Sequence, residues 1–495
     1  MQDTTQAAHQ ATRGELARRD DLDLQVKLGS APTASTRLTN DTKPIQPSSP
    51  SPNRPYHLTV VLNPAGGSQR SYELWKEAED VLQKVDVKRL TWEVVETKGK
   101  EDAERIGREL AVKVRQDQGE TKQALMILGG DGTVHEVLNG LLVREGGEVA
   151  KVPMELIVIP AGTANALYYS LFPPSSPLYP TSAPGAVFYS LLSFLGSLSP
   201  STRATEPHAQ PKSSLLPLSL ALNSLPTGDQ VLTTVVTSAA LHAAILHDAE
   251  SLRTSHPGIE RFKLAAQQNA AQWVSGALKL RGEVRRYDST SKQWLTLEGD
   301  IDGVVQVEGE FAYMTTALVD RFEPSFVVAP FRSPLHPLSP LSSSDQSRDT
   351  LALTPDPSID LILIRPLRHA PTALLVRQGR SQEAKDKFVD RVWEVSGGMY
   401  QEGRHVDLVY GQEERIEGEE EGGEVVEVFR CGKFEWVPPL TSPFRHLSTV
   451  QTSAPSTELK DRLVCLDGAL HDLGPGGNLK TKALGAEDVG VRVWA

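Results

Sequence analysis

Three glycine-rich turns within residues 63–165 are the part of this sequence whose residue types could do chemistry. Each turn follows a short apolar run and precedes a helical pattern, and the three read Asn63-Pro64-Ala65-Gly66-Gly67, Gly129-Gly130-Asp131-Gly132-Thr133 and Pro160-Ala161-Gly162-Thr163-Ala164-Asn165. A turn that enters a helix presents backbone N–H groups at the positive end of the helix dipole, a geometry that binds phosphate. Glycine lets the backbone approach the ligand closely and permits positive φ. We therefore expect a phosphate ester to bind along these turns.

The second turn carries an acid, Asp131, between its glycines. A carboxylate beside a phosphate site is electrostatically unfavourable unless a cation or a proton transfer uses it. Asp131 could contact Mg²⁺ or accept the proton of an attacking hydroxyl, and a positioned base typically contributes ~10²–10⁴-fold in rate. A single turn of this kind would favour a helix-capping aspartate. Three turns in a fixed order favour the chemical role.

Four further polar residues lie at or near the turns. Thr163 can cap the following helix and also bond a phosphate or nucleoside oxygen, whereas Asn165 bonds a neighbouring turn or simply caps its own. Asn63 contacts the nucleotide or stabilises its turn. Thr97 ends a strand pattern, at the edge where α/β sheets place ligands. Neither a Walker A loop nor a Rossmann Gly-x-Gly-x-x-Gly occurs, which argues against P-loop enzymes and standard dehydrogenases.

The elements that must position these turns alternate in type. Strand patterns cover residues 57–62, 90–97, 124–128 and 156–159, and helical patterns cover 68–85, 101–117, 133–142 and 163–171. This alternation predicts an α/β domain with a parallel sheet and right-handed crossovers. From Val231 onward apolar strand patterns dominate, apart from one helical pattern over 260–280, so a mostly β second domain is expected.

Composition shifts divide the chain further. We expect two folded domains: a catalytic domain over 56–198 and a β-rich domain over 218–440, with disordered loops at 333–357 and 411–424 in the second. A disordered tail over 1–55 precedes them, and a Ser/Pro-rich insert over 199–217 separates them. A linker over 441–458 then leads to a C-terminal segment, 459–495, that returns to the domain interface.

Charge and cysteine content limit the function classes. The 495 residues carry a net charge of −12 with no dense basic run, which argues against nucleic-acid binding and a polybasic membrane anchor. The two cysteines have no metal-ligand spacing, so no metal site of the protein's own and a reducing compartment are expected. The N-terminus lacks a secretory pattern, and the most apolar stretch, 186–198, is shorter than the ~20 residues that span a bilayer. A cytoplasmic protein that touches intracellular membranes peripherally is expected.

The three turns, in order, resemble the diacylglycerol kinase catalytic domain shared by sphingosine, ceramide and diacylglycerol kinases. The helix residues 134–141, Val-His-Glu-Val-Leu-Asn-Gly-Leu, are especially similar to sphingosine and ceramide kinases. The resemblance implies a β-sandwich lipid-binding domain after the α/β nucleotide domain, ATP with Mg²⁺, and a lipid substrate. It assigns Asp131 as the catalytic acid–base residue. ATP would be held by Asn63, Gly66, Gly67, Thr97, Gly129, Gly130, Gly132, Thr133, Gly162, Thr163, Asn165, Arg261 and Asp467.

Residues 241–251 are similar to the sphingosine kinase segment that supplies an aspartate for the substrate head group, and Asp248 matches that acid. A carboxylate suits the ammonium and hydroxyls of a sphingoid base. Arg261 matches an arginine that contacts the ATP phosphates, where it would offset the charge of the transferring group. The purely structural alternatives are a surface helix cap for Asp248 and a solvated salt bridge for Arg261.

Three positions depart from the family pattern. Only Arg70 follows the first turn where a basic residue is usual, and Ser255 replaces a second phosphate arginine for which Arg253 is close enough to substitute. The late Asp-Gly-Glu motif begins with Asp467 but ends in Ala469, and this missing carboxylate bears on nucleotide affinity.

The leading interpretation is phosphoryl transfer from ATP to the primary hydroxyl of a sphingoid base, with ceramide or diacylglycerol as alternative substrates. A NAD kinase or phosphofructokinase relative would share the Gly-Gly-Asp-Gly turn, but the other two turns and the Asp248 segment disfavour a soluble substrate. A lipid- or nucleotide-binding pseudokinase is the alternative from another class, motivated by Ala469 and Ser255.

Overall fold

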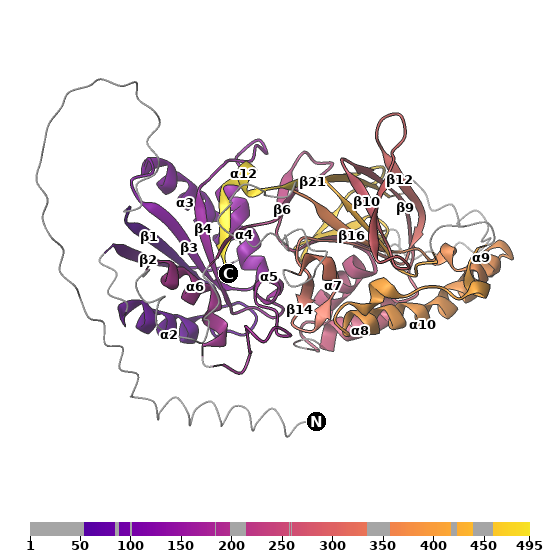
Figure 1. Ribbon diagram of the computed structural model, residues 1–495, viewed down its shortest axis with the longest axis horizontal. Helices are drawn as coiled ribbons and strands as arrows, with labels where there is room; N and C mark the ends of the chain where they lie inside the picture. The colour runs from indigo at the N-terminus through magenta and orange to yellow at the C-terminus, as the bar shows by residue number, and fades with distance from the viewer. Residues whose placement is uncertain are drawn as a thin grey trace, which may run out of the picture. The chain divides into compact units, whose positions relative to one another are not determined.

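A computed structural model describes residues 54–84, 89–99, 101–183, 185–198, 214–256, 258, 260–333, 357–416, 423–438 and 459–495 (Figure 1). The predicted linker lies outside these residues, and the predicted tail, the Ser/Pro-rich insert and the predicted loop over 333–357 lie largely outside them. Of the predicted loop over 411–424, only residues 417–422 lie outside them. No helix in the described ranges is both long and apolar enough to cross a bilayer.

The predicted parallel sheet is confirmed. It has six strands in the order β2-β1-β3-β4-β22-β5, and their bounds are β1 Tyr56–Leu62, β2 Leu90–Glu96, β3 Lys122–Gly129, β4 Met154–Pro160, β5 Leu215–Pro217 and β22 Val491–Trp494. β1 to β4 and β22 run parallel, and β5 pairs antiparallel at the edge. Because the strands are parallel, the turns that follow β1, β3 and β4 meet at one edge of the sheet.

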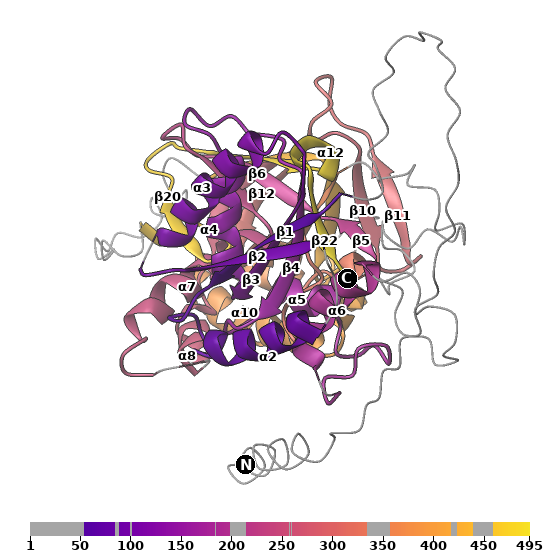
Figure 2. The ribbon, with the colours of Figure 1, turned by 90° about the vertical axis from the view of Figure 1, so that its left-hand side faces the viewer.

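Helices cover both faces of this sheet (Figures 1 and 2). Their bounds are α2 Ser71–Lys84, α3 Asp102–Gln116, α4 Asp131–Leu142, α5 Ala166–Leu171 and α6 Tyr189–Leu198. α2 and α6 share one apolar core with Leu58 and Met126. α3 and α4 share the other with Val61 and Ile127. Alternate residues of each strand therefore enter opposite cores, as a sheet buried on both faces requires.

The second domain is an antiparallel β-sandwich, in agreement with the expected fold class. One sheet has the order β11-β10-β17-β16-β13-β8-β19-β20 and the other has the order β12-β9-β18-β21-β6-β7. The bounds are β6 Leu220–Ser224, β7 Gln230–Thr233, β8 Val236–Ala240, β9 Val274–Arg281, β10 Val284–Asp288, β11 Gln293–Leu297, β12 Val305–Phe311, β13 Tyr313–Ala317, β16 Ile359–Ile364, β17 Glu427–Cys431, β18 Lys433–Val437, β19 Leu463–Leu466, β20 Ala469–Asp472 and β21 Leu479–Leu484. Both sheets contribute to one core, in which Trp436 and Phe311 are fully buried.

Some elements differ from the prediction. The helix expected over 260–280 is α8, Glu260–Asn269, followed by strand β9, because residues 274–281 alternate buried and less buried side chains against the sandwich core. Two helices, α9 (Ala370–Arg377) and α10 (Ser381–Met399), were missed. α9 is short and buries only Thr372 and Ala373, and in α10 the apolar residues form a narrow stripe among many charged ones.

The C-terminal segment does more than return to an interface. It supplies β19 and β20 to one sheet of the sandwich, β21 to the other, and β22 to the parallel sheet. β22 lies beside β4, as the yellow strand in Figure 1 shows. The end of the chain therefore joins the two domains by backbone hydrogen bonds, a long-range pairing that no local pattern reveals.

The environments of two histidines, the partly buried His242 and the fully buried His405, predict a pH dependence of stability. Burial lowers the pKa of His242, on α7 (Leu241–Ser251), and that of His405 to about 4, from an ordinary value of 6.5. Because the folded pKa is depressed, the unfolded chain takes up protons first, so stability is complete above pH 6.5 and falls as the pH drops toward 4. At pH 5 we expect a loss of about 2 kcal/mol in unfolding free energy per histidine.

Urea unfolding at pH 7 and pH 5 measures this loss. The variant His242→Asn, which cannot titrate, should show a smaller difference between the two pH values than the wild type. An equal difference in both proteins would contradict the contribution of His242.

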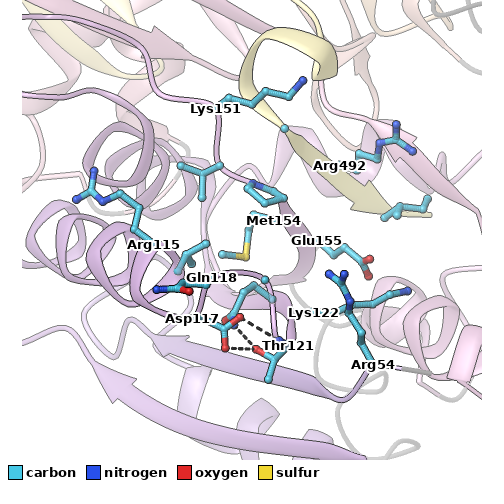
Figure 3. A pocket seen from close by; sticks show the side chains of 17 residues that line it. Arg54, Arg115, Asp117, Gln118, Thr121, Lys122, Lys151, Met154, Glu155 and Arg492 are labelled. Carbon is cyan, nitrogen blue, oxygen red and sulfur yellow. Dashed lines mark hydrogen bonds between the residues drawn. The ribbon is translucent and has the colours of Figure 1, made fainter. Parts of the chain in front are cut away.

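The two edges of the parallel sheet differ in character. The carboxyl edge carries the glycine turns. The amino edge carries a hollow of about 450 Å³, lined by residues next to β1, β3, β4 and β22 (Figure 3).

Candidate active site

Backbone hydrogen bonds tie the three glycine turns together at the carboxyl edge of the sheet. The N–H of Ala161 donates to the carbonyl of Gly129 at 2.9 Å, and the N–H of Asn63 donates to the carbonyl of Leu128 at 3.1 Å. The hydroxyl of Ser68 donates to the carbonyl of Ala161 at 2.9 Å. The turns that are separate in sequence thus form one continuous backbone surface.

The glycines permit this contact because no side chain would fit between the turns. A Cβ added to Gly67 would lie 2.5 Å from the backbone nitrogen of Thr163, and one added to Gly130 would lie 2.9 Å from the Cα of Gly162. Gly132 differs, since a Cβ there would meet nothing within 4 Å. Open space above a helix N-terminus is what a phosphate ligand needs.

Two substitutions separate packing from ligand contact. In Gly162→Ala, the new Cβ overlaps the Cα of Gly130, so backbone must move and we expect unfolding free energy to fall by about 1–3 kcal/mol. Gly132→Ala, the matched control, should leave stability within about 0.5 kcal/mol of the wild type. Chemical denaturation of both variants checks this, and equal stability of the two would refute the close approach of the turns.

Asn63 and Thr133 link the first and second turns. The amide Nδ2 of Asn63 donates to Oγ1 of Thr133 at 2.8 Å. Thr97, just after β2, is buried, and its N–H donates to the carbonyl of Leu62. Asn63 therefore stabilises the turns whether or not it also contacts a nucleotide.

Asp131 is the first residue of α4, and its carboxylate reaches the neighbouring turn. It accepts hydrogen bonds from the N–H groups of Ala166 at 2.8 Å and Leu167 at 3.0 Å, at the start of α5. The acid thus caps a second helix while it sits between glycines. Each oxygen takes one of these bonds, which leaves each a further lone pair for a proton or a cation.

The electrostatic setting of Asp131 favours proton uptake. Burial raises the pKa of its carboxyl group above the ordinary 3.8, and the charge of Asp467 adds to the rise, while the amide donors of Leu167 and Ala166 oppose it. A carboxylate with a raised pKa is a stronger base than an exposed aspartate. This is the one acid at the turns whose charge and position suit proton transfer.

Asn165 serves its own turn. It has φ of 55°, its Oδ1 accepts from the N–H of Gly162 at 2.8 Å, and its Nδ2 donates to the carbonyl of Gly162 at 3.1 Å. Among the described residues, the side chain of Asn165 bonds only Gly162 and so closes its own turn; it neither reaches a neighbouring turn nor caps α5. The expectation that Thr163 caps the helix was wrong, because α5 begins at Ala166 and Asp131 caps it.

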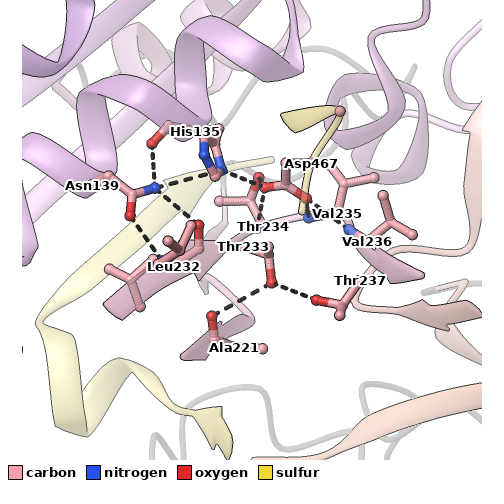
Figure 4. A network of polar contacts seen from close by, with 12 residues as sticks. His135, Asn139, Ala221, Leu232, Thr233, Thr234, Val235, Val236, Thr237 and Asp467 are labelled. Atoms are coloured by element: carbon pink, nitrogen blue, oxygen red, sulfur yellow. Dashed lines mark hydrogen bonds and ion pairs between the residues drawn. The ribbon is translucent and has the colours of Figure 1, made fainter. Parts of the chain in front are cut away.

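Asp467 lies at the centre of a polar network between the two domains (Figure 4). Its carboxylate accepts from the N–H groups of Thr234, Val235 and Val236 at 2.6–2.9 Å and from the hydroxyl of Thr234 at 3.0 Å. Nδ1 of His135, on α4, lies 3.2 Å away. The side chain of Asp467 is fully buried. Through these hydrogen bonds its carboxylate links the β7–β8 turn to His135 on α4.

Asn139, one turn after His135 on α4, makes a second link (Figure 4). Its Nδ2 donates to the carbonyl of Leu232 at 2.9 Å, and its Oδ1 accepts from the N–H of Leu232 at 2.8 Å. The side-chain amide thereby pairs with β7 as a strand would. The helix that carries Asp131 is held to the sandwich at two points.

Asp248, on α7, is surrounded by donors. Nζ of Lys460 lies 2.7 Å from its carboxylate, Nδ2 of Asn269 lies at 2.8 Å and Nδ1 of His247 lies at 2.8 Å. Burial alone would raise the pKa of Asp248, but the hydrogen bonds from Lys460, Asn269 and His247 hold it below its ordinary value. The acid is therefore charged and already paired with an ammonium.

Arg261, on α8, stacks its guanidinium on the ring of the adjacent Phe262, 4.7 Å from the centroid. Within the described ranges it makes no hydrogen bond or ion pair with the glycine turns. The structure thus brings together the three turns, Asp131 and Asp467, while Asp248 and Arg261 lie on the neighbouring pair of helices. Arg253 pairs with Glu250, and Arg70 pairs with Glu73, both in exposed positions.

Sequence reasoning missed His135, Asn139 and Lys460. The spacing of His135 and Asn139, four residues apart after a glycine turn, places both on one helix face and could have drawn attention to them. Lys460 carried no signal, because its partner Asp248 is more than 200 residues away.

The residues fit a nucleotide with Mg²⁺. No group of three or more metal-ligating side chains occurs in the described part of the chain. Mg²⁺ commonly needs only one or two carboxylates beside substrate phosphates, and Asp131 has lone pairs to offer. The open backbone at Gly132 offers room for phosphate.

Comparison with known proteins agrees with this geometry. Residues 57–184 match the diacylglycerol kinase catalytic domain. Similar relatives include sphingosine kinase 1 of Homo sapiens (34% identical over 119 residues, 24% of this chain and 28% of the relative) and sphingoid long chain base kinase 4 of Schizosaccharomyces pombe (34% over 119 residues, 24% and 23%). Sphingosine kinase B of Dictyostelium discoideum is 32% identical over 114 residues, 23% of this chain and 14% of the relative.

The matched segment spans less than a third of each of these relatives and about a quarter of this chain. The residues that match the diacylglycerol kinase catalytic domain, 57–184, contain all three glycine turns and Asp131. Residues 57–184 are therefore similar to a diacylglycerol kinase catalytic domain, and about a quarter of the chain is similar to segments of sphingosine kinases.

Proposed function

We propose that this protein is an ATP-dependent lipid kinase that transfers the γ-phosphoryl group to the primary hydroxyl of a sphingoid long-chain base. The observation that carries the proposal is the joined surface of three glycine turns, with the carboxylate of Asp131 beside it. That surface suits a nucleotide triphosphate, and the raised pKa of Asp131 suits a base. Peripheral contact with the membrane that holds the lipid is part of the proposal.

In this mechanism the backbone of the glycine turns binds and orients the phosphates. ATP held by the glycine turns would supply the phosphoryl group, and Mg²⁺ held by the phosphates and Asp131 would neutralise part of the charge of that group. Asp131 accepts the proton of the lipid hydroxyl and fixes its direction of attack. Positioning and charge neutralisation account for most of such catalysis. His135 and Asn139 keep α4, and with it Asp131, in register with the sandwich that would hold the lipid.

The choice of a sphingoid base rests on Asp248 and on the names of the relatives. A charged acid next to an ammonium, here Lys460, is a site that accommodates a second ammonium by exchange. Arg261 is the proposed partner of the phosphates, by its match to the family pattern.

A substrate panel tests the proposal. Purified full-length protein is incubated with γ-labelled ATP, Mg²⁺ and mixed micelles that hold sphingosine, phytosphingosine, ceramide or diacylglycerol. Label in a sphingoid base, lost in Asp131→Asn and reduced in Asp248→Ala, is the expected result. Label only in ceramide or diacylglycerol would keep the kinase and overturn the role of Asp248. ATP binding without label in any lipid would favour the pseudokinase, for which Ala469 and Ser255 are the motivation.

A further inference from the structure

The hollow at the amino edge of the parallel sheet is lined mainly by positively charged residues, although the protein as a whole is acidic. Of the residues that line it, five are basic and two are acidic, although the whole chain carries a net charge of −12. The basic residues are Arg54, Arg115, Lys122, Lys151 and Arg492. They come from four separate segments of the α/β domain, so folding gathers them.

The two acids of the hollow are engaged by other partners. The carboxylate of Asp117 accepts from the N–H and the hydroxyl of Thr121, at 3.0 and 2.8 Å. Glu155 accepts from the hydroxyl of Tyr56 at 3.1 Å and from Nε1 of Trp494 at 3.1 Å. Burial raises the pKa of Glu155, while the nearby charges of Lys122 and Arg492 and the hydrogen bonds from Tyr56 and Trp494 oppose the rise. Neither acid is committed to neutralising the cations by a direct ion pair.

Four of these basic side chains are unpaired or only weakly paired with acids, so they are available to bind an anionic ligand. Among the described residues Arg54 and Arg115 form no ion pair, and a guanidinium nitrogen of Arg54 would lie 3.5 Å from a Cβ at Gly119. Lys151 and Arg492 each lie 3.8 Å from Glu487, a highly exposed acid whose pairing is weak.

Lys122 reaches toward the phenol of Tyr56, with Nζ 3.2 Å from its oxygen and 5.0 Å from the ring centroid. Figure 3 shows Arg54, Lys122 and Glu155 on one side of the hollow, with Arg115 and Gln118 on the other. Arg54 and Lys122 therefore share the side of the hollow that holds the partly buried acid, Glu155.

We propose that this hollow binds a phosphate-bearing ligand, either a free phosphate ester or a phosphorylated headgroup, through Arg54, Lys122, Lys151 and Arg492. Arginine and lysine form strong charge-assisted hydrogen bonds with phosphate oxygens. The volume of about 450 Å³ has room for such a group. The site is distinct from the glycine turns, because Lys122 and Gly129 stand at opposite ends of β3, roughly 23 Å apart at ~3.3 Å per residue. The inference does not depend on the proposed kinase activity.

Calorimetric titration of the full chain with inorganic pyrophosphate tests this site. The titration contains a saturating non-hydrolysable ATP analogue, so that the glycine turns are blocked. Phosphatidylcholine vesicles with and without phosphatidic acid form the second arm. Binding of pyrophosphate would identify a free phosphate ester as a sufficient ligand, and binding only to the phosphatidic acid vesicles would identify a membrane headgroup. Failure of both probes to bind would overturn the proposal.

One variant that weakens binding and one that tightens it together distinguish loss of the site from misfolding of the protein. Arg54→Ala with Lys122→Ala should weaken binding by about tenfold or more, since each removes a charged hydrogen bond. Glu155→Gln should tighten binding several-fold, because it removes a negative charge and keeps an oxygen acceptor for Tyr56 or Trp494. The matched control is Arg144→Ala with Lys387→Ala, two exposed cations outside the hollow, of which Arg144 follows the end of α4 and Lys387 lies on α10. Unchanged affinity in the first variant, or equal loss in the control, would refute the site.

Discussion

Replacing Asp131 by asparagine should lower the turnover number for lipid phosphorylation by about 10²–10⁴-fold, the usual contribution of a positioned base. Asparagine keeps an oxygen acceptor for one of the two N–H groups at the start of α5 but cannot take up a proton. The fold should survive, since the glycine turns remain bonded to each other through backbone. The measurement is kcat in the lipid assay, together with thermal unfolding of the same preparation.

The matched control for this variant is Asp300→Asn. Asp300 also accepts hydrogen bonds from two backbone N–H groups, those of Asp302 and Val304, but it lies in a turn of the sandwich. We expect a similar small change in stability and an unchanged kcat. If both variants lost the same activity, the loss would reflect folding and not proton transfer at Asp131.

The pH profile gives a second view of Asp131. Because burial and Asp467 raise its pKa, the acidic limb of kcat should lie above the ordinary 3.8 of an aspartate. Activity should therefore be lost as the pH falls through this raised value, since the protonated acid cannot accept a further proton. A limb at or below 3.8 would count against a basic role for Asp131.

The parallel sheet and its turns could be predicted because their signals are local. Each apolar run, glycine turn and helical stripe lies within about 30 residues, the size of one βαβ unit. The acid at the tip of the second turn stands out for the same reason, because glycines flank it on both sides. What the sequence could not show is that the Asp131 carboxylate caps α5, which depends on how two turns pack.

The joints between the domains could not be predicted. β22 pairs with β4 across more than 300 residues, and Asp467 meets His135 across 332. Such pairs depend on the final fold and leave no periodic pattern. The pairing of Lys460 with Asp248 belongs to the same class, and it changes the expectation for the substrate acid from a vacant carboxylate to one that must exchange partners.

The partners of Asp467 give this residue a structural role that the family resemblance alone did not indicate. The resemblance implies a nucleotide contact. The structure gives its fully buried carboxylate four donors from the β7–β8 turn, as well as His135. A carboxylate with this many donors has little capacity left for a ligand. Its remaining influence on chemistry is electrostatic, through the pKa of Asp131.

Asp467→Asn should therefore destabilise the protein by about 3 kcal/mol. An asparagine has one acceptor oxygen, so its NH₂ group must face N–H donors of Thr234 or of Val235 and Val236. Those buried donors would lose their partner. Urea unfolding measures the loss. Asp472→Asn, on the adjacent strand, is the control, because its pair with Arg462 is partly exposed and should contribute less than about 1 kcal/mol.

The same variant separates positioning from nucleotide binding. If Asp467 acts through Asp131, loss of its charge lowers the pKa of Asp131, so the acidic limb of kcat moves to lower pH while KM for ATP stays near the wild-type value. If Asp467 contacts the nucleotide, KM for ATP rises and the limb stays in place. A rise in KM for ATP with unchanged stability would contradict the structural role of Asp467, because the donors of the β7–β8 turn would then not depend on this carboxylate.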